Sequence, residues 1–184
     1  MKTLIAIVGM PGSGKSIATA YLHKKGIPFV RFGDLTDETL KERSLPITPE
    51  NEQMVREKLR QDFGMDVYAV KAKPKIDEIL KTSDTISLDG LYSWEEYLFL
   101  KNEFPNLVVI AIYARPQVRY QRLSERSVRP ISKEEARARD IAEIENLNKG
   151  GPIAIADFLI DNSSDTREEL HKKIDDILTH INHD

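Results

Sequence analysis

A glycine-rich stretch near the amino terminus constrains the fold of this chain more than any other part of its sequence. Residues 9–16 read GMPGSGKS and directly follow an apolar run, LIAIV, at residues 4–8. This order predicts a buried strand, then a sharp loop, then a helix that begins near Lys15. In such a loop the glycines allow the backbone N–H groups to point inward, and the helix amino terminus adds a partial positive charge. We therefore interpret the stretch as a phosphate-binding loop, in preference to an accidental match.

The chemistry of such a loop assigns roles to its residues. Lys15 would reach the β- and γ-phosphates of a nucleoside triphosphate, and the hydroxyl of Ser16 would hold Mg²⁺. We expect the nucleotide to contact the loop and the first turn of the helix, at Gly9, Pro11, Gly12, Ser13, Gly14, Lys15, Ser16 and Ile17.

Length, charge and cysteine content limit the classes of protein that remain. The 184 residues suffice for a substantial core but not for a second full domain, so one domain over residues 1–184 is expected. With 30 acidic against 27 basic residues, the net charge of −3 gives no general attraction to nucleic acid or an anionic membrane. The absence of cysteine excludes disulfides and thiolate metal sites, and no apolar run approaches the roughly 20 residues of a membrane span. We expect a cytoplasmic protein without a nucleic-acid or membrane partner.

Apolar runs alternate with helical patterns along the chain. Strands are expected at residues 3–8, 27–32, 84–88, 107–113 and 158–160. Helical patterns cover residues 15–25, 36–43, 49–62, 65–80, 93–104, 116–127, 132–148 and 166–181, with a kink or break at Pro74 and a helix stop at residues 150–152. The alternation predicts an α/β fold in which helices cover both faces of a parallel sheet. The long polar stretch between the second and third strands could wall a substrate pocket or simply cover the sheet.

Polar residues follow three of the expected strands, at the edge where open α/β sheets hold their ligands. Asp89 could order the waters of Mg²⁺ or accept a proton from a substrate hydroxyl, and it could instead cap the next turn. We favour the metal or acid–base role for Asp89. Asp34 stands where a general base or a ligand for a substrate hydroxyl would lie, although a helix cap or turn explains it equally well. The sequence NSSD at residues 162–165 would lie near the nucleotide base or, as we favour, form a turn before the last helix.

Seven of the twelve arginines lie between residues 115 and 139. Arg115, Arg119, Arg122 and Arg126 recur at intervals of three or four, so one helix face would present a row of guanidinium groups. Arginines in such a row can stabilise the negative charge of a migrating phosphoryl group. The alternative is a solvated face that pairs with nearby glutamates. We take Arg119, Arg122 and Arg126 as the candidate catalytic arginines.

The same region contains a helix break at Pro130, between two helical patterns. A helix–break–helix segment can close over a site and exclude water, so residues 115–139 are expected to form a short lid. Arg139, Asp140 and Glu143 are expected to form a structural ion pair.

Taken together, these motifs resemble the small-molecule kinases with a P-loop, in particular nucleoside monophosphate kinases and dephospho-CoA kinases. The stretches FGDLTDE, LDGLYSWEE and RYQRLSER are similar to an adenylate-kinase-like family, and AIADFLIDNSSDTREEL is similar to the end of dephospho-CoA kinases. The resemblance implies a three-layer P-loop NTPase fold with a five-stranded parallel sheet, in which the Asp89 strand lies beside the P-loop strand. It also implies a helical substrate-binding insertion over residues 34–81 and an arginine-rich lid over residues 115–139.

Two positions depart from this resemblance. Asp37 stands where nucleoside monophosphate kinases usually carry an arginine for the acceptor phosphate, and Tyr92 replaces a second candidate arginine. Arg43, Arg56 or Arg60 could compensate, so the acceptor stays open.

The sequence predicts an ATP-dependent phosphotransferase that moves the γ-phosphoryl group of Mg-ATP to a small nucleotide-like acceptor, of the nucleoside monophosphate or dephospho-CoA type. We expect a monomer or a homodimer. The alternative is a nucleotide-dependent ATPase switch that acts on a protein partner; a GTPase is disfavoured because the guanine-reading motif NKxD is missing.

Overall fold

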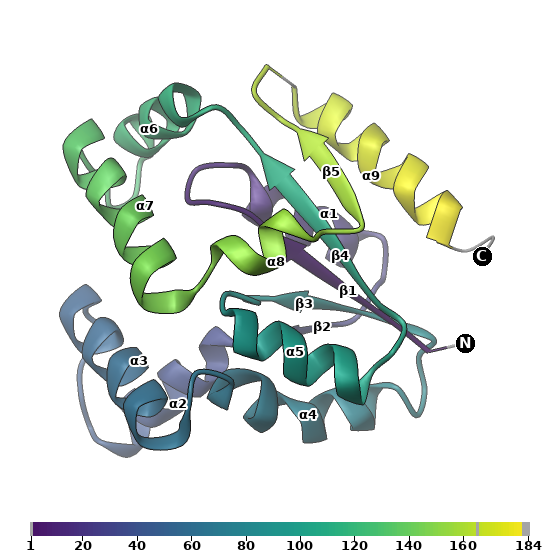
Figure 1. Ribbon diagram of the computed structural model, residues 1–184, viewed down its shortest axis with the longest axis horizontal. Coiled ribbons are helices and arrows are strands. Elements are labelled where there is room, and N and C mark those ends of the chain that lie inside the picture. Colours follow the sequence, from purple (N-terminus) through teal and green to yellow (C-terminus); the bar gives the residue numbers. More distant parts are fainter. Residues whose placement is uncertain (1, 165, 182–184) are drawn as a thin grey trace.

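A parallel sheet organises the computed structural model, which describes residues 2–164 and 166–181 (Figure 1). Within those residues the sheet has five strands, in the order β2-β3-β1-β4-β5. Each neighbouring pair of strands is parallel. The strands are β1 (Thr3–Val8), β2 (Phe29–Arg31), β3 (Thr85–Asp89), β4 (Leu107–Tyr113) and β5 (Phe158–Asp161). The predicted α/β class and the placement of the Asp89 strand beside the P-loop strand are both confirmed.

Helices form a layer on each face of this sheet. They are α1 (Lys15–Lys24), α2 (Gly33–Glu42), α3 (Pro49–Phe63), α4 (Val67–Ile79), α5 (Trp94–Glu103), α6 (Pro116–Glu125), α7 (Lys133–Leu147), α8 (Gly150–Ala154) and α9 (Arg167–Ile181). Buried residues of α1 and α9 join the core on one face, whereas those of α2, α3, α4 and α5 join the core on the other. In the part of the chain described here, no helix is long and apolar enough to cross a membrane.

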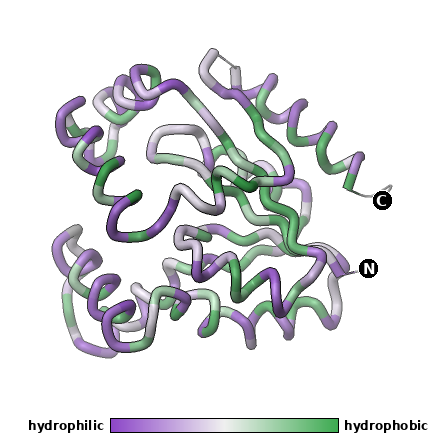
Figure 2. The backbone as a smooth tube through the Cα atoms, viewed as in Figure 1, coloured by the Kyte–Doolittle hydropathy of each residue, from purple (hydrophilic) through white to green (hydrophobic). Residues whose placement is uncertain are grey.

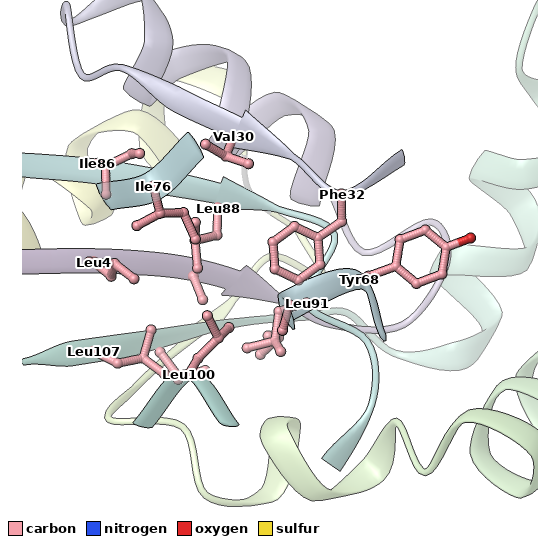
Figure 3. Close-up of a cluster of buried hydrophobic side chains, with 14 of the residues drawn as sticks. Leu4, Val30, Phe32, Tyr68, Ile76, Ile86, Leu88, Leu91, Leu100 and Leu107 are labelled. Atoms are coloured by element: carbon pink, nitrogen blue, oxygen red, sulfur yellow. The ribbon is translucent and has the colours of Figure 1, made fainter. Parts of the chain in front are cut away.

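Strand β1 lies at the centre of the sheet and is buried along its whole length. Successive side chains of a strand point to opposite faces, so both faces of a covered sheet demand apolar residues. Leu4, Ala6 and Val8 accordingly pack into the core beneath α4 and α5, part of which is drawn in Figure 3. Ile5 and Ile7 pack into the core beneath α1 and α9. Because this apolar run forms the central strand, the P-loop that follows it lies at the middle of the carboxyl edge of the sheet. Figure 2 shows the strands as the most hydrophobic segments of the chain.

The structure departs from the sequence prediction at several element boundaries. Helix α2 begins at Gly33 and not at Thr36, because the chain turns directly from the short edge strand β2 into the helix. Asp34 therefore lies in the first turn of α2. Pro74 lies within α4 without ending it; both Pro74 and Val70, whose carbonyl loses its helical donor, are exposed to solvent.

The ends of the arginine-rich region also differ from the prediction. Helix α6 ends at Glu125, and the backbone of Arg126 is extended. The last arginine of the predicted row therefore lies outside the helix. Residues 150–152, which we expected to stop the preceding helix, instead begin the short helix α8. A single turn of helix that contains two glycines has no periodicity from which it could be predicted.

We predict that replacing Leu88 by alanine destabilises the protein by about 2–5 kcal/mol, because the side chain is completely buried between β3 and the helices above it. Replacing Leu98, which is 49% exposed on α5, should change stability by less than about 0.5 kcal/mol. Urea unfolding followed by circular dichroism measures both values. Equal losses in the two variants would contradict this description of the core.

Candidate functional site

The P-loop connects β1 to α1 and is pressed against neighbouring backbone. Gly9 adopts a φ of 146°, and a Cβ atom at this position would lie 2.3 Å from the carbonyl oxygen of Ile112 in β4. Gly12 adopts a φ of 77°, and its Cβ atom would lie 2.7 Å from the carbonyl oxygen of Arg119 in α6. Side chains at either position would collide with backbone that cannot easily move. The glycines thus allow the loop to be held tightly between β4 and α6.

The side chain of Arg119 anchors the P-loop to α7 and to the end of β4. Its guanidinium forms a double hydrogen bond with the carboxylate of Asp140, at 2.9 and 2.6 Å, and also donates to the carbonyl oxygens of Pro11 and Ala114 at 3.0 and 3.1 Å. Only 5% of Arg119 is exposed. Because its guanidinium is engaged with Asp140 and the backbone, the structure favours a positioning role for Arg119 over the predicted catalytic role. Asp140 was expected to pair with Arg139 and Glu143; those two residues do pair, at 2.9 Å, without it.

Asn162 holds the other side of the loop. It follows β5, and its side-chain N–H group donates to the carbonyl oxygen of Ser13 at 2.7 Å. Its own backbone N–H donates to the carbonyl oxygen of Tyr113, so Asn162 connects the P-loop to the ends of β4 and β5. The turn predicted for residues 162–164 is thus an anchor of the loop, and Asp165 lies outside the described residues.

Lys15 and Asp89 lie close enough at the carboxyl edge of the sheet for each charge to affect the pKa of the other group. Lys15 begins α1 and donates to the carbonyl oxygen of Met10 at 2.9 Å. Asp89 ends β3 opposite Ile7 of β1, two residues before the loop. Burial lowers the pKa of Lys15 to about 7, and the positive charge of Lys149 adds to the effect. Burial likewise raises the pKa of Asp89, against the opposing effect of Arg31 and Lys15. The site therefore contains a lysine and a carboxylate that water screens poorly.

A large cleft of about 700 Å³, which we call the loop-side cleft, opens beside the P-loop. Among its walls are Gly12, Lys15, Ser16, Arg122, Arg126 and Asn162. Arg122 donates through Nη2 to the carbonyl oxygen of Asn162 at 2.8 Å, while its buried Nη1 has no partner among the described residues. Two of the three predicted arginines, Arg122 and Arg126, thus reach this cleft, and its size and basic lining suit a nucleotide.

A second, smaller cleft of about 150 Å³ lies at the carboxyl ends of β2 and β3, next to α2 and α3. We call it the strand-end cleft, and its charged walls are Arg31, Asp37, Glu52, Arg56, Arg60 and Asp89. Asp89 is thus positioned beside both this cleft and Lys15. Tyr92, found in place of a second candidate arginine, also lines it.

Asp34 does not line either cleft in the described structure. Its carboxylate pairs with Arg31 at 3.3 Å and with Lys75 at 3.0 Å. These two cations engage the group that we considered as a general base. The cap and turn alternatives are both wrong for Asp34, because Phe32 is the N-cap of α2 and Asp34 lies within the first turn of the helix. Asp37, found in place of an expected arginine, pairs with Arg31 at 2.7 Å.

The sequence analysis missed Lys149 as a site residue. This lysine precedes α8, is only 3% exposed, and forms an ion pair with Glu143. Its Nζ lies 4.5 Å from the centre of the Tyr92 ring, and its charge contributes to the low pKa of Lys15. Arg139, on the other side of Glu143, also affects Lys15. No periodicity in the sequence marks Lys149, because it lies in the connection that we interpreted as a helix stop.

Ser16 and Asp89 are the residues expected to hold Mg²⁺. Ser16 is exposed at the start of α1, and Asp89 is half-buried. The backbone carbonyl of Asp89 accepts from the N–H of Phe32, but its carboxylate receives no hydrogen bond or ion pair from any described residue. Across residues 2–164 and 166–181, no group of three or more His, Cys, Asp or Glu side chains could hold a metal by itself. A hydroxyl and one carboxylate suit Mg²⁺ when substrate phosphates and water supply its other ligands, so the residues fit a metal that arrives with a nucleotide.

Comparison with known proteins places this geometry in context. The AAA domain family model matches residues 5–143. A UPF0200 protein of Thermococcus sibiricus is 41% identical over 165 residues, which cover 88% of this chain and 86% of the relative. The shikimate kinase of Bacteroides thetaiotaomicron is 13% identical with a TM-score of 0.60, over 96% of this chain and 98% of that one. A gluconokinase of Sinorhizobium meliloti is 15% identical with a TM-score of 0.52, over 93% and 88% of the two chains. These two structures share the fold.

We predict that Asp140→Ala destabilises the protein by about 3–5 kcal/mol, because it leaves the buried guanidinium of Arg119 without its counter-ion. Arg139→Ala, at the neighbouring position, breaks an exposed ion pair and should cost about 0–1 kcal/mol. Urea unfolding of both variants gives the two values. If Arg139→Ala costs as much as Asp140→Ala, the assignment of Arg119 as the anchor of the loop is wrong.

Proposed function

This chain belongs to the UPF0200 family and to the AAA domain family, and from that premise we propose that it transfers the γ-phosphoryl group of ATP to a small acceptor. One observation supports the proposal above the others. Lys15 begins α1 directly after the P-loop and Asp89 ends the strand beside β1, with a nucleotide-sized cleft beside the lysine and a small arginine-lined cleft beside the aspartate. A transfer between two bound molecules requires two binding regions that hold the reacting groups close together.

The residues of the loop-side cleft would bind the nucleotide. The backbone N–H groups of the P-loop and the ammonium group of Lys15 would hold the β- and γ-phosphates. Arg122 and Arg126 would contact the triphosphate from α6 and the segment after it, since Arg122 retains a buried donor without a partner among the described residues. Ser16 and Asp89 would hold Mg²⁺, which when bound neutralises charge on the β- and γ-phosphate oxygens.

The transfer itself exchanges one P–O bond for another. An oxygen of the acceptor forms a bond to the γ-phosphorus, the bond from that phosphorus to the β–γ bridging oxygen breaks, and ADP leaves with the electron pair. When the acceptor is a hydroxyl, its proton passes to Asp89 or to water. The charges of Lys149 and Arg139 act on Lys15, so these three residues would stabilise the negative charge that is spread over the migrating group in the transition state. The candidate acceptors are nucleoside monophosphates, dephospho-CoA and, from the names of the two kinases with the same fold, small hydroxy acids.

We predict that Lys15→Ala lowers phosphoryl transfer at least about 100-fold while the protein stays folded, because the variant loses the cation closest to the migrating charge. Lys24→Ala removes an exposed lysine from the last turn of α1 and should leave the rate unchanged. The assay measures ADP formation from ATP and Mg²⁺ with each candidate acceptor. If no acceptor raises ADP formation above the rate with ATP alone, the protein is not the proposed transferase, and an ATPase switch becomes the better description.

Nucleotide binding should take up protons above neutral pH. In the empty site the pKa of Lys15 is about 7, so at pH 8 most molecules carry a neutral lysine. Bound phosphates favour the charged form, so binding adds up to one proton and the affinity falls by up to about tenfold for each pH unit above 7. Calorimetry in buffers of different ionisation enthalpy, between pH 7 and pH 9, measures the uptake. The uptake should disappear in Lys15→Ala, and an unchanged uptake in that variant would contradict the assignment.

A further inference from the structure

The strand-end cleft contains an arginine that is buried and only partly satisfied. Arg60 of α3 is 8% exposed and lines this cleft. Its Nη2 donates to the carboxylate of Glu96 at 3.2 Å, and its guanidinium carbon lies 4.6 Å from the centre of the Tyr68 ring. Its buried Nε has no hydrogen-bond partner in the described part of the chain. Because buried polar groups in proteins are nearly always hydrogen-bonded, this arginine of the cleft wall needs a further partner, which a ligand or water in the cleft would supply.

Other side chains hold Arg60 in a fixed orientation. The second carboxylate oxygen of Glu96 accepts hydrogen bonds from the backbone N–H groups of Tyr92 and Ser93, at 2.7 and 3.1 Å. The hydroxyls of Tyr68 and Thr36 are 2.7 Å apart, which fixes the ring that stacks on the guanidinium. The arginine is therefore oriented before any ligand arrives, as a binding site requires.

Arg56 provides a second cation one helical turn away on α3. Its nearest acidic partner is Glu52, at 3.9 Å, which is longer than a hydrogen bond. The same carboxylate oxygen of Glu52 accepts a closer hydrogen bond from Arg129, at 3.2 Å. Arg31, the remaining arginine of the cleft, is engaged with Asp37 and Asp34. Arg56, which has no acidic group within hydrogen-bond distance, and Arg60, whose Nε is unpartnered beside its pair with Glu96, are thus the cations of this cleft that we consider for a ligand.

The size of the cleft restricts that ligand. Its volume of about 150 Å³ equals that of about five water molecules at ~30 Å³ each. Pockets that enclose drug-sized ligands measure roughly 300–1,000 Å³. The cleft therefore suits a small molecule better than a whole nucleoside monophosphate.

We propose that the strand-end cleft binds a small alcohol that carries one anionic group, a carboxylate or a phosphate, with that group held by Arg56 and Arg60. The proposal rests on the proposed function, because the molecule would be the phosphoryl acceptor. Two arginines engage the anionic group, so the oxygen that accepts the phosphoryl group belongs to a hydroxyl elsewhere on the molecule. Transfer forms a bond between that oxygen and the γ-phosphorus, releases ADP, and sends the hydroxyl proton to a base or to water.

Calorimetry with the full chain, Mg²⁺ and a non-hydrolysable ATP analogue tests the proposal. The probes are glycerate, glycerol 3-phosphate, inorganic phosphate, uncharged glycerol and AMP. We expect glycerate or glycerol 3-phosphate to bind more tightly than glycerol and AMP, and the difference between the first two identifies a carboxylate or a phosphate as the preferred group. Inorganic phosphate reports on the anion site without the alcohol, and should compete with the preferred probe.

Variants of α3 locate the binding. Arg56→Met should weaken the preferred probe at least tenfold, whereas Lys58→Met, which removes an exposed cation paired with Asp62 on the same helix, should leave it unchanged. Arg60→Lys keeps the charge but removes Nε, and should also weaken the probe; if this variant unfolds, Arg56→Met decides. None of these changes should alter the affinity for the ATP analogue.

Three outcomes would overturn the proposal: no probe binds, AMP binds as tightly as the small anions, or Arg56→Met binds the preferred probe normally. Failure of the ATP analogue to bind would instead count against the proposed function. In that case the same probes are titrated into the nucleotide-free protein, and loss of binding in Arg56→Met still reports on the arginine site.

Discussion

The ion pair between Arg119 and Asp140 is the interaction on which the site depends. It joins α6 to α7. The same guanidinium also holds the P-loop and the end of β4, because it donates to the carbonyl oxygens of Pro11 and Ala114. Buried ion pairs contribute little net stability when compared with apolar replacements, but losing one partner is costly. The pair therefore acts as a positional constraint: the loop that would hold phosphate, the end of β4 and the arginine-rich helices keep one relative arrangement.

Several buried charged side chains lie close to the P-loop. Lys15, Lys149 and Glu143 come from the P-loop, the start of α8 and α7, and the charges of Lys149 and Glu143 both act on Lys15. Asp89 adds a carboxylate from the neighbouring strand, where burial raises its pKa. Charges held in such a low-dielectric environment interact strongly with one another and with any phosphate that enters. The P-loop kinase-like fold thus concentrates its electrostatic effects at one edge of the sheet, between the two clefts.

The sequence alone was enough to predict the features that depend on residues close together in the chain. The apolar run before GMPGSGKS predicted β1 and the loop, and the position of Asp89 after an apolar run predicted its place at the strand end. Prediction from the sequence failed where the role of a residue depends on a partner that is distant in the chain. Arg119 and Asp140 are 21 residues apart, and Arg60 and Glu96 are 36 apart, and nothing in the spacing of the arginines distinguishes a buried anchor from a ligand-binding group. Lys149 was missed for the same reason, since only the folded chain shows which lysine is buried.

The carboxylate of Glu52 contacts two arginines from different parts of the chain. It accepts from Arg129, in the segment between α6 and α7, and lies near Arg56 of its own helix. An anion that engages Arg56 removes one of the competitors for this carboxylate and leaves Glu52 to Arg129 alone. If the proposed acceptor binds to Arg56, its binding and the contact between the two helical regions would be thermodynamically linked, and each would strengthen the other by the same factor. In the proposed transferase, such linkage would favour an ordered kinetic scheme that limits hydrolysis of ATP by water while the acceptor is absent.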